Sequence, residues 1–70
     1  MNTQAKRLLE LGINLDLFYV ITIRGNEIEL QGEATEKVIR EAKKLVELEF
    51  NSNLNYLQGY TKDLAVTLTF

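Results

Sequence analysis

Residues 17–31, which read LFYVITIRGNEIELQ, decide the fold. The stretch begins with aromatic and β-branched residues, the types that suit a pleated strand. Gly25-Asn26 then interrupts the apolar run, and a two-residue loop of this kind predicts a tight hairpin turn. The turn fixes the register, which pairs Arg24 with Glu27, Ile23 with Ile28, Thr22 with Glu29 and Ile21 with Leu30.

This register sorts the hairpin side chains into an apolar face and a more polar face. A one-residue slip would place Ile28 and Leu30 opposite polar neighbours, so the pattern and the turn agree. The apolar face should join the core and comprises Tyr19, Ile21, Ile23, Ile28 and Leu30. The opposite face of the first strand carries Phe18, Val20, Thr22 and Arg24.

Two helices are predicted around the hairpin. Residues 3–11 form a short helix that ends at Gly12, because a left-handed position after a helix suits glycine. Thr35 caps a longer helix over residues 36–50. The first helix turns Ala5, Leu8 and Leu9 to one side, and the second has an apolar stripe of Val38, Ile39, Ala42, Leu45, Val46 and Phe50. Leu48 falls outside this stripe, where it covers the first helix or lies at the surface.

The remaining residues contain one clear strand. Residues 51–63 read as a loop, although the alternation around Tyr56 leaves open a short edge strand within residues 54–60. Residues 64–70 alternate regularly, which is typical of a half-buried strand. One face of that strand holds Leu64, Val66, Leu68 and Phe70, and the other holds Ala65, Thr67 and Thr69.

The element order α-β-β-α-(β)-β predicts a single α+β domain over residues 1–70. We expect a two-layer sandwich, with an antiparallel sheet of three or four strands and both helices on one face. Residues 17–24 are apolar on both faces, so we expect them to form the central strand. Residues 27–31 and the last strand would then be its two neighbours, and either could extend the sheet of a partner.

The composition argues against catalysis and cofactor binding. The 70 residues include no His and no Cys, so the usual general base and the thiolate nucleophiles and metal ligands are missing. Glu27 and Glu29 lie about 7 Å apart on one strand face, a glycosidase-like separation. Arg24 and Thr22 pair with them across the hairpin, so we interpret them as surface residues. We therefore expect a non-enzyme without metal or cofactor.

The charge and the N-terminal sequence bear on location. The net charge of −2 gives no overall attraction to nucleic acid or to an anionic membrane. The first residues lack the basic-then-apolar order of a signal peptide, and the apolar run 17–23 is too short to cross a bilayer. We expect a cytoplasmic protein without membrane contact.

Protein binding is the function that these patterns favour. If both helices cover one sheet face, the other stays bare, and a modest apolar patch within a polar rim is typical of a small interface. The candidate partner-binding residues are Phe18, Val20, Thr22, Arg24 and Glu29 on that face, with Tyr56 and Tyr60 from the loop. The alternative is that the first helix swings round and buries Phe18. A short chain without reactive residues fits a small adaptor, an inhibitor or a self-associating accessory protein of bacteria or phages.

Weak nucleic-acid binding is the alternative hypothesis. Lys37, Arg40 and Lys44 are spaced to form one stripe on the second helix, and a basic stripe can follow a phosphate backbone. Glu33 and Glu36 each precede a base by four residues, which is also typical of a merely solvated helix. No phosphate-binding glycine motif accompanies the stripe, so nucleic acid is the less favoured partner.

Overall fold

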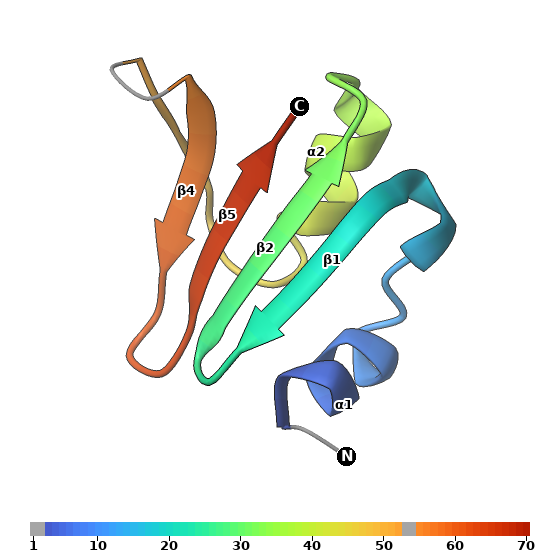
Figure 1. Cartoon of the computed structure of the whole chain (residues 1–70), viewed down its shortest axis with the longest axis vertical. Helices are drawn as coiled ribbons and strands as arrows, with labels where there is room; N and C mark the ends of the chain where they lie inside the picture. Colours follow the sequence, from blue (N-terminus) through green and yellow to red (C-terminus); the bar gives the residue numbers. More distant parts are fainter. Residues whose placement is uncertain (1–2, 53–54) are drawn as a thin grey trace.

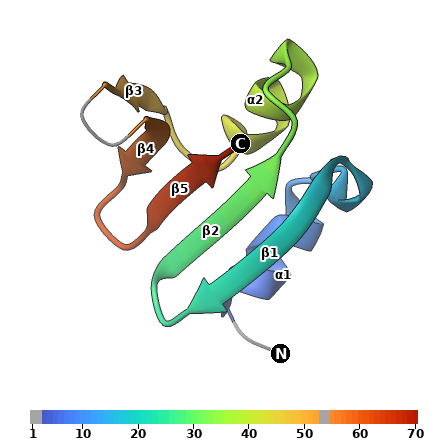
Figure 2. The ribbon, with the colours of Figure 1, turned by 45° about the horizontal axis from the view of Figure 1, so that its top comes forward.

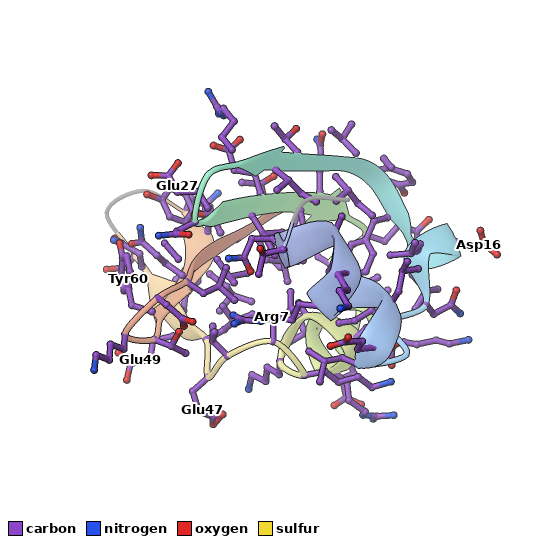
Figure 3. The ribbon with its side chains drawn as sticks, turned by 90° about the horizontal axis from the view of Figure 1, so that it is seen from below. Arg7, Asp16, Glu27, Glu47, Glu49 and Tyr60 are labelled. Carbon is purple, nitrogen blue, oxygen red and sulfur yellow. The ribbon has the colours of Figure 1, made fainter. Side chains whose placement is uncertain are left out.

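The structure is a computed structural model that describes residues 3–52 and 55–70. It is a small α+β domain with two helices and one five-stranded mixed sheet (Figure 1). The elements in chain order are α1 (Thr3–Glu10), the short 3-10 helix η1 (Leu15–Leu17), β1 (Phe18–Arg24), β2 (Glu27–Gly32), α2 (Glu36–Ala42), β3 (Glu49–Asn51), β4 (Tyr56–Tyr60) and β5 (Ala65–Thr69). Figure 3 shows both helices on the same side of the sheet, as the sequence predicts.

The predicted hairpin is confirmed. β1 and β2 pair antiparallel, with Arg24 opposite Glu27 and Ile23 opposite Ile28. Gly25 has a φ of +57°, and no positive φ occurs at Asn26. A positive φ at the first central residue alone is typical of a type II′ turn, whose twist matches that of the flanking strands.

The predicted strand order is wrong. The sheet has the order β1-β2-β5-β4-β3, so β1 is an edge strand and not the central one. β5 lies beside β2, to which it is parallel, and β4 lies antiparallel on its other side. The physical reason is the connection through α2, since a helix that crosses behind the sheet lets the next strand run in the same direction as β2. That strand is β3, and the antiparallel pairs β3–β4 and β4–β5 then bring β5 back parallel to β2. Figure 2 shows β2 leading directly into that crossover.

The second helix is shorter than predicted, because α2 ends at Ala42. Backbone bonds from Lys44 N–H to Glu41 and from Leu45 N–H to Ala42 tighten the chain into a turn. The next residues alternate in exposure as a strand does, with Val46 and Leu48 buried. Phe50, predicted to lie in the core, is 61% exposed on β3.

Residues 56–60 form an inner strand rather than a loop or an edge. β4 lies between β3 and β5, with Leu57 opposite Leu68 and Tyr60 opposite Ala65. Residue 54, the first of the predicted short strand, lies outside the described residues. The last strand alternates as predicted, since Val66 and Leu68 are fully buried, although Phe70 is 45% exposed.

A β-bulge in β1 reverses two predicted side-chain positions. Phe18 pairs with Gly32 and Val20 with Gln31, so β1 has one extra residue, Tyr19, between these pairs. Because a bulge shifts the alternation by one residue, Phe18 turns toward the core and is 8% exposed. Tyr19, predicted to lie in the core, is 65% exposed.

The core lies between the sheet and the two helices. Its largest fully buried side chains belong to the central strands and the turn before β5, and they are Ile28, Leu30, Leu64, Val66 and Leu68. The helices contribute Leu8, Val38 and Ala42. In α1 the buried polar Gln4 accompanies Leu8, whereas Leu9, predicted to face the core, is 58% exposed. Gly12 ends α1 with a φ of +66°, as predicted.

Candidate functional site

The sheet face opposite the helices carries no covering element in the described part of the chain (Figure 3). We call it the open face. Alternate residues of each strand point to it, and the ladder registers arrange them in rows across the sheet. The middle row runs Thr22, Glu29, Thr67, Gln58, Glu49. One flanking row runs Val20, Gln31, Thr69, Tyr56, Asn51, and the other runs Arg24, Glu27, Ala65, Tyr60.

The open face brings together six of the seven predicted partner-binding residues. Four of them, Val20, Thr22, Arg24 and Glu29, come from the β1–β2 hairpin. The other two, Tyr56 and Tyr60, come from β4 at the far side of β5. The two tyrosines were predicted as separate loop contacts, and the sheet order places them on the same surface as the hairpin residues.

Phe18 does not belong to this surface. Its side chain is buried on the helical side of the sheet, among the core residues. The expected alternative was that the first helix would cover Phe18 on the outer face. The cause is instead the bulge at Tyr19, which turns Phe18 inward, while Val20 remains 49% exposed.

The open face is acidic. It carries the carboxylates of Glu27, Glu29 and Glu49, and Arg24 is the one basic residue that the five described strands contribute to it. The Arg24 guanidinium forms an ion pair with Glu29 at 2.7 Å, a diagonal contact across the hairpin. Glu27 and Glu49 form no ion pair within the described residues. The surface is therefore suited to a partner that brings positive charge.

An open hollow of about 530 Å³ adjoins this surface at the β3–β4 end of the sheet. Glu47, Glu49, Phe50 and Tyr60 are among the residues that line it. Phe50 and Tyr60 are 61% and 66% exposed, so both rings are available for contact. A second hollow, of about 100 Å³, lies over β1, β2 and β5 on the open face. That volume is too small for a ligand of ordinary size, which needs ~300 Å³ or more.

Three titratable groups outside the open face have shifted pKa values. The hydrogen bond from the Tyr19 hydroxyl to Glu33, at 3.0 Å, raises the pKa of Tyr19, and desolvation and the Glu33 charge raise it further. The Lys44 ammonium and the Asn14 backbone N–H both bond to Glu41 and lower its pKa. Arg7 and then Thr61 lower the pKa of Asp63. The Asn14–Glu41 and Arg7–Asp63 bonds join segments distant in the chain, so Glu41 and Asp63 help to hold the fold together.

The predicted basic stripe is not continuous. Lys37 and Arg40 lie on α2 and are exposed, but Lys44 follows the end of the helix. The Lys44 ammonium forms an ion pair with Glu41 at 2.9 Å. Two helical cations therefore remain without an ion pair in the described ranges 3–52 and 55–70.

Further features constrain the chemistry of the described residues. They contain no group of three or more His, Cys, Asp or Glu side chains placed to hold a metal ion. Neither helix in the described part of the chain has the length and apolar character to span a bilayer. Comparison of the chain with protein-family models, curated proteins and solved structures finds no significant match. The functional argument therefore rests on the geometry of this molecule.

Glu47, Glu49 and the hollow beside them were not predicted from the sequence. Both acids fell within the helix predicted over residues 36–50 and were not singled out. The signal for a strand was present, because Val46, Leu48 and Phe50 alternate with the two glutamates. That alternation has the period of a strand and would have placed both acids on one side of the chain.

Proposed function

We propose that the protein is a non-enzymatic interaction module that binds another protein through the open face. The single observation that carries this proposal is the five-stranded sheet with helices on one side only, which leaves Val20 and Tyr60 exposed within a polar and acidic surround. Exposed aromatic side chains within a polar rim are the usual anatomy of a small interface. The role is that of an adaptor, an inhibitor or a self-associating accessory protein.

The proposal is tested by adding positive charge and bulk to the open face. Val20→Lys with Thr67→Lys should abolish capture of a partner, because two lysines project into the contact and repel a basic surface. The matched control, Leu9→Lys with Ala34→Lys, adds the same charge at exposed positions outside the sheet and should retain capture. Affinity purification with mass spectrometry identifies a partner that the wild type and the control share and the open-face variant loses.

Light scattering on the same proteins separates a partner from a second copy. If the occupant is a second copy, the wild type has one mass above 8.0 kDa, and the open-face variant returns to 8.0 kDa. A wild type that stays at 8.0 kDa and captures no partner contradicts the proposal. So does capture that survives Val20→Lys with Thr67→Lys.

Nucleic-acid binding is a second candidate, based on Lys37 and Arg40, which are exposed without an ion pair in the described chain. Two or three cations give weak and salt-sensitive binding. A mobility shift at low salt that disappears in the triple variant Lys37→Glu, Arg40→Glu, Lys44→Glu would favour this candidate over the first. Absence of a shift for the wild type excludes it.

A further inference from the structure

The free edge of β3 is the end of the sheet at which another strand can be added. β3 pairs with β4 on one side, and no strand of residues 3–52 or 55–70 lies on its other side. A strand edge presents backbone N–H and C=O groups that can bond to an extended segment of another chain. The opposite edge, β1, is less suitable, because it carries a bulge that disrupts strand pairing.

The hollow of about 530 Å³ lies at this end of the sheet. Its lining includes residues 49–51 of β3, the following Ser52, and residues 58–60 of β4. The hollow therefore lies against the β3–β4 pair, next to the outer edge of β3. A segment that pairs with this edge would lie beside the hollow, and its side chains could enter it.

The chemistry of the lining selects positive charge. Glu47 and Glu49 contribute two carboxylates, and none of the described residues that line the hollow is basic. Neither glutamate has an ion pair or a side-chain hydrogen bond among the described residues. Phe50 and Tyr60 add two exposed rings, and an aromatic face attracts an ammonium or guanidinium group. Figure 3 shows Glu47, Glu49 and Tyr60 at the β3–β4 end of the molecule.

We propose that an extended basic segment of a protein partner adds as a strand to the edge of β3 and places Lys or Arg side chains in this hollow. The inference rests on the protein-binding function proposed above and names its chemistry. Val46 and Leu48 are buried, so Glu47 and Glu49 both point away from the core. They are about 7 Å apart along the chain, which matches basic residues at alternate positions of the added strand.

The experiment uses the full chain labelled with ¹⁵N and a synthetic capped heptapeptide of alternating lysine and valine. Titration to about 1 mM peptide should shift the backbone resonances of residues 47–52 and 58–60 before others. A peptide with glutamate in place of lysine should not bind. A third peptide, with proline in place of the central valine, should bind several-fold more weakly, because proline removes a donor that strand pairing needs.

A pair of charge-matched variants locates the site. Glu47→Lys with Glu49→Lys should weaken the lysine peptide at least tenfold. Glu10→Lys with Glu36→Lys makes the same change of charge on the helices and should leave most of the binding. Both double variants keep the buried residues, and their spectra establish that they fold.

Several results would overturn the inference. One is that the lysine peptide causes no resonance shifts, or causes shifts centred on another surface. Another is that the glutamate or the proline peptide binds as tightly as the lysine peptide. A third is that both double variants lose the same affinity for the lysine peptide. A wild type that dimerises through β3 without peptide would also overturn it, since a second copy then occupies the edge. If partner capture depends on Val20 and Thr67 but the lysine peptide does not bind, the strand-addition inference is rejected and the proposed protein-binding function is kept. Capture that is indifferent to the open face rejects the proposed function.

Discussion

Two glycines on the core side of the sheet lie where other parts of the chain approach closely. A Cβ atom on Gly32 would come within 3.0 Å of the Val38 side chain and 3.1 Å of the Leu17 carbonyl oxygen. A Cβ atom on Gly59 would collide with the Glu47 carbonyl oxygen and with the Val46 side chain. The segment that leads into β3 therefore rests directly on the backbone of β4, and no larger residue fits at Gly59.

Gly59→Ala should destabilise the protein strongly. The collision is with backbone, which cannot move aside as a flexible side chain can, so we expect a loss on the order of 3 kcal/mol. The comparison is Gly12→Ala, where φ is +66° but nothing lies within 4 Å of the added atom. Backbone strain alone should cost that variant about 1 kcal/mol. Urea unfolding measures the loss of unfolding free energy in both variants. If Gly12→Ala loses as much as Gly59→Ala or more, the segment before β3 does not rest closely on the backbone of β4.

At the scale of elements, β1 is an edge strand of the sheet and β5 is its middle strand. β5 is bonded on both sides, by β2 and β4, whereas β1 is bonded by β2 alone. In a two-residue hairpin the residues that flank the turn form a bonded pair, and bonded pairs alternate along the strands. Arg24 and Thr22 therefore direct their N–H groups toward β2, and Ile23 and Ile21 direct theirs toward the free edge.

Hydrogen exchange should reveal this difference residue by residue. We expect the amides of Ile21 and Ile23 to exchange much faster than those of Thr22 and Arg24, because only the latter pair bonds within the hairpin. In β5 the amides should all be slow. Exchange followed by NMR checks the pattern. Uniformly slow amides along β1 would contradict its edge position.

The elements also show which parts of the fold could be predicted. The β1–β2 hairpin could, since its turn and alternation are local properties of residues 17–31. The strand order could not, because a parallel contact between β2 and β5 depends on where the chain returns after α2. Residues 45–50 were misassigned because their apolar side chains fit a helical stripe as well as a strand alternation. The bulge at Tyr19 left no recognisable signal, and it alone misplaced Phe18.

The candidate site was predicted in part for related reasons. The open face follows from two helices packed on one side, which the apolar stripes indicate. Its hairpin residues were therefore placed correctly apart from Phe18. Tyr56 and Tyr60 were assigned to a loop, since only the sheet order brings β4 beside β5. The acidic edge at β3 was missed because that strand was assigned to a helix.

At the scale of the whole molecule, charged contacts tie the N-terminal segment to the rest of the chain. Arg7 of α1 bonds to Asp63, in the turn between β4 and β5, at 3.2 Å. The Asn14 backbone N–H bonds to Glu41 on α2 at 2.8 Å. Both carboxylates have lowered pKa values, so both are more stable as anions in the folded protein than in the unfolded chain.

The lowered pKa values of Glu41 and Asp63 predict that acid destabilises the fold. A lowered folded-state pKa contributes stability that is fully present above the ordinary values, 4.5 for Glu41 and 3.8 for Asp63. That stability is lost as the pH falls through the folded-state values. Asp63→Asn should be less stable than the wild type near pH 7, and the difference should close toward about pH 2.

Urea unfolding across this pH range measures the effect. Glu27→Gln is the control, because Glu27 has no ion pair or side-chain hydrogen bond within the described residues. Its curve should run close to that of the wild type throughout. If the free energies of unfolding of Asp63→Asn and the wild type differ by the same amount at every pH, Asp63 does not stabilise the fold through its charge.

The parallel contact between β2 and β5 sets how the chain reaches this structure. The β1–β2, β3–β4 and β4–β5 pairs can each form from neighbouring residues, and the β2–β5 contact joins the two parts of the sheet (Figure 1). Bringing distant residues together loses chain entropy before any burial compensates for it. We therefore expect the docking of β5 along β2 to limit the rate of folding, because pairing of residues distant in the chain is slow.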